Sequence, residues 1–401
     1  MKQVKQQRNR LNFKTQPVDT EDKLDTIPRC LSGLLCMCGI ILRDNQVSAT
    51  NQPKNKNQKQ KSSIKISSLW TRTEFIFFHL YVLFAFVYVV FEYRNYLFYV
   101  SEAVDIISFA VIADTLNYRK KSLQEIIKRI QRLPRKTGKV PRCGRFSPIN
   151  VLLISSILYT ALYGLFTFSY HGIGDAEQAD SENQDLGTLL KTFLWAVCVL
   201  LICGGMSFFI CLFVYICLLI DEKLQAIMQS LNITTTPKIS TTALFRKQRR
   251  MFCSLQKLTS EVNDIFTKII LLWVVKIVLR ACLSFYEIII QASSSDNPHM
   301  QETTILDIMY DICHVSIMSM YAGRIVESKN HILDRLVGLC GLNNNQMEHC
   351  IKDIHFFVSI VGHSNMAMTV WNIFFLTKGT AITIISGLIS YAIIIYQMIV
   401  R

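Results

Sequence analysis

An apolar stretch at residues 304–323 carries polar side chains that share one face of a helix. They stand at positions i, i+3, i+4 and i+7 and are Asp307, Tyr310, Asp311 and His314. Burying carboxylates in a bilayer is costly, so such residues usually face a partner or a water-filled cavity. Two interpretations remain open: an ion pair between Arg280 and Asp311 that only joins two helices, or one wall of a ligand pocket.

The pocket interpretation includes groups predicted at a similar depth in other apolar segments. Arg280 offers a cation, Glu102 and Asp105 offer further carboxylates, and Trp195 and Tyr286 offer aromatic rings. Such a mixture suits a small hydroxylated or nitrogenous ligand. Each aromatic residue taken alone is more typical of a packed core.

The apolar segment 379–400 carries a narrow stripe of small and polar residues. They recur at spacings of three and four, which places them on one helix face: Thr380, Thr383, Gly387, Ser390, Ile394 and Gln397. One interpretation is close packing against neighbouring helices, which small residues permit in lipid. The other is a pore, in which hydroxyl groups and a Gln replace part of an ion's hydration and Ile394 closes the path by dewetting.

Both patterns need membrane-spanning helices to position them, and the composition is consistent with such helices. Hydrophobic residues make up 51% of the 401 residues and charged residues only 18%. A spanning helix needs about 20 mostly apolar residues. The sequence therefore predicts an all-α membrane protein with seven transmembrane helices, at 75–91, 97–116, 149–170, 193–220, 269–290, 304–323 and 379–400.

The net charge of +14 is concentrated in alternate loops. The loop 117–148 is rich in Lys and Arg with Glu125 as its single acid, whereas 171–188 holds acids and no Lys or Arg. Under the positive-inside rule the amino terminus and the basic loops are cytoplasmic, and seven spans then place the carboxyl terminus outside. This distribution fits a membrane protein in contact with lipid, and we expect no nucleic-acid partner.

Sequence motifs for catalysis are absent. The chain has no phosphate-binding Gly loop, no His and Glu metalloprotease helix and no nucleophile elbow. The cluster Cys30, Cys36 and Cys38 lacks the second pair of ligands that a zinc site needs. We therefore expect no enzymatic activity, no cofactor and no metal.

The segment from Trp371 to Met398 resembles the signature of insect gustatory receptors, which is a Thr-Tyr pair, five hydrophobic residues and Gln-Phe. Tyr391 and Gln397 match in place, while Ser390 stands for the Thr and Met398 for the Phe. The arrangement of spans and basic inner loops agrees along the whole chain.

The resemblance implies a gustatory receptor that acts as a ligand-gated, non-selective cation channel in the plasma membrane of sensory neurons. It implies a homo- or heterotetramer with other gustatory receptor subunits, opened by a small tastant such as a sugar or a bitter compound. The seventh helices would line one central pore for the permeating cations. Tyr391 would brace this helix, and the pore or gate residues would be Thr383, Ser390, Ile394, Gln397 and Met398.

The predicted organisation has four parts. Residues 1–74 form a cytoplasmic tail with a short interfacial helix, and 75–323 form a ligand-binding bundle of six helices. Residues 324–373 form cytoplasmic amphipathic helices that anchor the bundle. The pore-lining helix occupies 374–401.

Two other functions share some of these features. A G-protein-coupled receptor has the same number of helices, but it would need the opposite topology and Asp-Arg-Tyr and Asn-Pro motifs, which do not appear here. A secondary transporter would use the carboxylates of 304–323 for ion coupling, yet the sequence shows no internal repeat.

Overall fold

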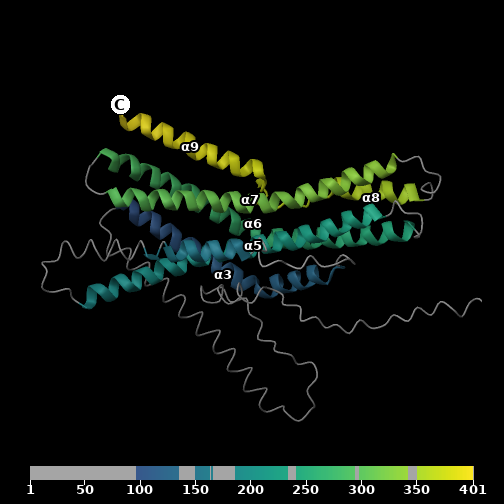
Figure 1. The fold of residues 1–401 in the computed structure, drawn as a ribbon, viewed down its shortest axis with the longest axis horizontal. Helices are drawn as coiled ribbons and strands as arrows, with labels where there is room; N and C mark the ends of the chain where they lie inside the picture. Colours follow the sequence, from purple (N-terminus) through teal and green to yellow (C-terminus); the bar gives the residue numbers. More distant parts are fainter. Residues whose placement is uncertain are drawn as a thin grey trace, which may run out of the picture.

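The structure is a computed structural model that describes residues 96–134, 150–162, 164–165, 186–233, 241–293, 298–341 and 350–400. This part of the chain is almost entirely helical (Figure 1). Its helices are α3 (Tyr96–Arg132), a short helix at Asn150–Leu162, α5 (Leu186–Ile233), α6 (Thr241–Ser293), α7 (Pro298–Cys340), α8 (Ile351–His363) and α9 (Lys378–Val400). Two short strands, β1 (Thr369–Val370) and β2 (Phe374–Phe375), lie between α8 and α9.

Four of the described helices, α5, α6, α7 and α9, are long and apolar enough to cross a membrane. The first three have 48, 53 and 43 residues, whereas about 20 suffice for one crossing. They therefore extend well beyond a bilayer, while α9 with 23 residues matches one crossing. Figure 1 shows α9 beside one half of this long bundle and α8 beside the other half.

A continuous apolar core holds the long helices together. α5 packs against α7, and α3 packs against α6. Phe266 of α6 lies between Phe209 and Phe213 of α5, with ring centroids 6.0 and 5.5 Å away. Aromatic contacts at these separations stabilise beyond their buried area. The core fixes the relative register of the helices and so decides which polar residues meet.

A tight hairpin fixes the point at which α9 begins. Its strands pair antiparallel, and Trp371 and Asn372 in the turn have φ of 45° and 57°. Asn263 of α6 accepts the backbone N–H of Thr369 at 2.8 Å and donates to Thr369 Oγ1 at 2.9 Å. The Trp371 N–H donates to the Thr267 carbonyl of α6 at 3.3 Å. The position of α9 is thus tied to α6.

The predicted spans lie within helices where the structure describes them, but α3, α5, α6 and α7 run well past the spans 97–116, 193–220, 269–290 and 304–323. The span 379–400 coincides with α9 to within one residue. The span 304–323 is only one half of α7, which continues to Cys340 with no break at Arg324. The segment 75–91, the predicted interfacial helix and the cluster Cys30, Cys36 and Cys38 lie outside the described residues. The division into four parts stays a prediction.

Candidate functional site

The polar face predicted at 304–323 meets two cations of α6. Lys276 Nζ lies 3.3 Å from Asp105 Oδ1 of α3 and 3.6 Å from Asp311 Oδ1 of α7. The guanidinium of Arg280 lies 2.5 Å from Asp105 Oδ2 and 2.6 Å from Asp307 Oδ2. Lys276 and Arg280 are one helical turn apart, so both face the same way. We call these five residues the ion cluster.

The ion cluster is almost sealed from solvent. Asp307 is its most exposed member at 13%, and the other side chains are 4–6% exposed. Buried charges are stable only when they are paired and hydrogen-bonded. Among the described side chains, three carboxylates face two cations, which gives one excess negative formal charge when all are ionised. Oδ2 of Asp311 has no hydrogen-bond partner within the described part of the chain. The cluster could therefore accept one more donor or cation.

Aromatic and hydroxyl groups border the ion cluster. Tyr310 stacks on Tyr159 of the helix Asn150–Leu162 with ring centroids 3.7 Å apart, and meets His314 edge-on at 3.8 Å. The Tyr310 hydroxyl contacts Ser207 Oγ of α5. The Tyr159 hydroxyl donates to Asp307 Oδ1 at 3.4 Å. Five helices thus supply polar and aromatic groups to one region, a combination typical of small-ligand sites.

Most of the residues predicted for the pocket do lie together. The backbones of Glu102 and Trp195 lie in α3 and α5, but their side chains are outside the described part of the chain. Tyr286 is 36% exposed and lies on a different side of α6 from Arg280. The structure brings together Asp105, Arg280, Asp307, Tyr310, Asp311 and His314.

The ion pairs differ from the single pair that the sequence suggested. Arg280 pairs with Asp105 and Asp307, and the cation beside Asp311 is Lys276. Sequence reasoning missed Lys276, although its position four residues before Arg280 in an apolar segment was a usable signal. Tyr159 and Ser207 carry no such signal, because their position beside the ion cluster depends on how separate helices pack.

The stripe of α9 points away from its own bundle. Only 17% of the most apolar stretch of α9 is buried within the chain, against 83% for that of α5. If the stripe serves for packing, its partner must therefore be lipid or another subunit. Tyr391 is half-buried and lies close to Cys282 of α6. The buried face comprises Ala381, Leu388 and Ile395, and the exposed stripe comprises Thr383, Gly387, Ser390, Ile394 and Gln397.

Comparison with known proteins gives a consistent result. The sequence model of the 7tm Chemosensory receptor family matches residues 53–399. The chain is similar to the structure of the insect olfactory receptor OR5 from Machilis hrabei, with a TM-score of 0.68 and 11% identity over 92% of this chain and 97% of that chain. It is also similar to that receptor in complex with eugenol, with a TM-score of 0.63 and 12% identity over the same shares. No curated protein matches the chain.

The structural likeness spans nearly the whole chain and shows a common fold. The predicted fold class, an all-α membrane protein with seven transmembrane helices, is therefore confirmed.

Proposed function

Because this chain belongs to the 7tm chemosensory receptor family, we propose that it is a gustatory receptor that acts as a ligand-gated, non-selective cation channel. The observation that carries the proposal is the exposed stripe of α9. Polar side chains within a span usually face protein or water, because lipid cannot satisfy them. A stripe that its own bundle leaves uncovered would meet water if several copies of α9 surrounded a pore.

The proposed pore is built from four subunits, identical or drawn from other gustatory receptors. Ile394 and Met398, which are 55% and 67% exposed in the single chain, form its hydrophobic constriction. Gln397, Ser390 and Thr383 offer polar groups to the permeating cations. The contact between Tyr391 and Cys282 braces α9 against α6. The plasma membrane of sensory neurons is the proposed location.

The proposed ligand site is the ion cluster with its aromatic border. The excess negative charge and Asp311 Oδ2, which has no hydrogen-bond partner among the described residues, favour a ligand that donates hydrogen bonds or carries a positive charge. A sugar or a nitrogenous bitter compound meets this requirement. The similar olfactory receptor was solved in complex with eugenol, which supports a small-molecule ligand for this fold.

Current recordings from cells that express the chain test the pore proposal. We expect Gln397→Ala to change the relative permeability to cations, because it removes a polar group from the stripe. Ser390→Ala should alter permeability in the same assay. Ile389→Ala is the control, since this residue is also exposed on α9 but lies about 100° around the helix from Ser390, off the stripe. If both stripe variants carry normal currents with unchanged permeability, α9 does not line the pore.

A further inference from the structure

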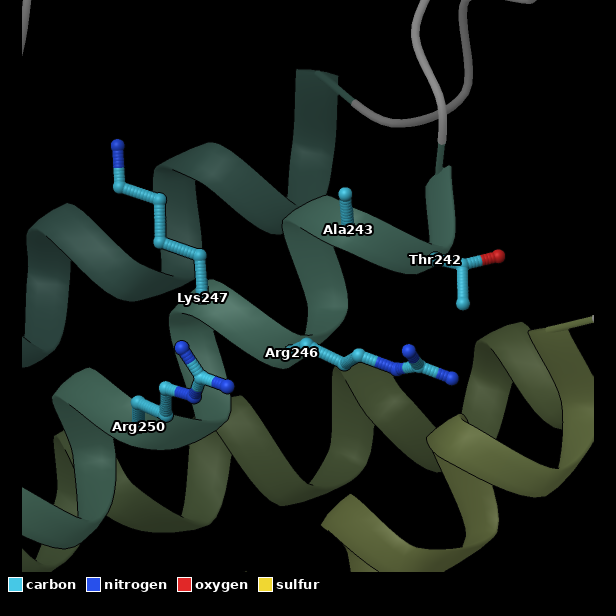
Figure 2. Close-up of a pocket in the computed structure, with 5 residues that line it drawn as sticks. All are labelled: Thr242, Ala243, Arg246, Lys247 and Arg250. Carbon is cyan, nitrogen blue, oxygen red and sulfur yellow. The ribbon is translucent and has the colours of Figure 1, made fainter.

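A basic pocket lies at the start of α6, at the end of the bundle far from α9. It has a volume of about 420 Å³ and is lined by Thr242, Ala243, Arg246, Lys247 and Arg250. Figure 2 shows Lys247 and Arg250 on the same side of the helix, whereas Arg246 extends away from them towards a neighbouring helix. Three of the five lining side chains are therefore cationic. The ion cluster and the α9 stripe have no part in this pocket.

The positive charge of this pocket is only partly neutralised. Asp353 of α8 lies 3.1 Å from Arg246 Nε and 3.5 Å from Arg249 Nη1. Lys247 and Arg250 are exposed, and neither has an acidic partner within the described part of the chain. The positive end of the α6 macrodipole adds to the same field. An anion of more than one charge would restore the balance.

The pocket is too distant from the bilayer for a lipid headgroup to reach it. The apolar run of α6 begins after Lys268, and a rise of 1.5 Å per residue places Arg250 about 27 Å before that point. The surface potential of a membrane decays within a Debye length of about 8 Å. The occupant must therefore come from solution, and the predicted orientation makes that solution the cytoplasm.

We propose that this pocket binds a soluble small molecule that carries two or more phosphate groups. Arg and Lys side chains are the usual partners of phosphate, Arg through paired hydrogen bonds and Lys as a point charge. The lining residues lie within three turns of α6, so the site is open and a charged ligand can reach it from solution. The bound molecule would lie beside the Arg246–Asp353 pair that joins α6 to α8, and so would reinforce that junction.

Calorimetric titration of the purified full-length chain with inositol hexakisphosphate, in detergent free of anionic lipid, tests the proposal. We expect saturable binding with one site per chain. Lys247→Glu/Arg250→Glu should weaken it at least tenfold, and Lys247→Gln/Arg250→Gln should weaken it to a smaller extent. Arg119→Glu/Lys121→Glu is the matched control, because both residues are exposed on α3 and the change in net charge is the same. Its affinity should stay within twofold of the unmodified chain.

Three results would overturn the proposal. If the unmodified chain shows no saturable binding, the pocket is not a binding site for this molecule. If the control variant loses as much affinity as Lys247→Glu/Arg250→Glu, the binding is only unspecific attraction between opposite charges. Binding only to vesicles that contain phosphatidylinositol bisphosphate, or only to a polyglutamate peptide, assigns the pocket to lipid or to an acidic protein segment. The readout is binding rather than current, so its failure is distinguishable from failure of the channel proposal.

Discussion

At the scale of single residues, the charges of the ion cluster depend on one another. Lys276 is shared between Asp105 and Asp311, and it is only 4% exposed. Removing one partner of a buried ion pair typically costs about 3–5 kcal/mol, because an uncompensated charge stays behind. We therefore expect Lys276→Met to lower the midpoint of thermal unfolding of the purified receptor markedly, as measured by scanning fluorimetry.

A second variant distinguishes two causes of lower stability, the loss of charge balance and the loss of packing. Lys276→Met/Asp311→Asn removes one charge of each sign, so we expect its unfolding midpoint to lie above that of Lys276→Met alone. The two residues are in contact, and such pairs are rarely additive. If the double variant is no more stable than the single one, charge compensation is not what makes Lys276 important.

Asp311 also provides the sharpest test of ligand binding. Asp311→Asn keeps the size of the side chain but removes its charge, and a hydrogen bond to a charged group contributes about 1.5–3 kcal/mol. We expect at least a tenfold higher half-activating concentration of whichever sugar, alkaloid or amino acid evokes current from a screened panel. The matched control is Asp221→Asn, since Asp221 is equally buried but pairs with Ser328 and Gln225 elsewhere.

Surface labelling must show that both aspartate variants reach the membrane. An unchanged concentration dependence in Asp311→Asn, at normal surface level, would leave the ion cluster as a junction between helices and nothing more.

At the scale of elements, the hairpin before α9 depends on one side chain of α6. Asn263 bonds both the backbone N–H and the hydroxyl of Thr369, and leaving such groups unpaired costs about 1–3 kcal/mol. We expect Asn263→Ala to lower the thermal unfolding midpoint clearly. Asp264→Ala changes the exposed neighbour on the same helix and should have little effect. Equal shifts in the two variants would contradict an anchoring role for Asn263.

The sequence was most informative about elements whose pattern is local. The run 379–400 is apolar throughout apart from its stripe, so the bounds of α9 follow from the sequence, whereas spacing left open whether the stripe packs against neighbouring helices or lines a pore. The helix α7 was harder, because its second half is amphipathic and the hydropathy falls while the helix continues past Arg324. Hydropathy marks the membrane part of a helix and not the helix itself.

The pairing inside the ion cluster was beyond sequence reasoning for a different reason. Spacing places Asp307 and Asp311 on one face of α7, but it does not state the height at which α7 meets α3 and α6. That register is set by the apolar core, including the contacts of Phe266 with α5. A shift of one turn between α6 and α7 would leave only one of Lys276 and Arg280 beside an aspartate of α7.

At the scale of the whole molecule, positive and negative charge are separated along the long axis of the chain. The uncompensated cations of α6 lie in its membrane-distal part, and the ion cluster near the start of α7 carries the excess negative charge. Positive charge resists transfer across the membrane during insertion, so we expect the basic end to stay in the cytoplasm. The same orientation would place the proposed ligand site on the outer side, where a tastant would arrive.

Epitope tags test this orientation directly. We expect a tag after Arg401 to be labelled on intact cells, and a tag before Met1 to be labelled only after permeabilisation. A tag in the acidic loop 171–188 is the control for an external position. Labelling of the amino-terminal tag on intact cells would show that the molecule has the opposite orientation. The basic pocket of α6 would then face the extracellular medium and the ion cluster would lie in the cytoplasmic half of the membrane, so one measurement bears on both proposals.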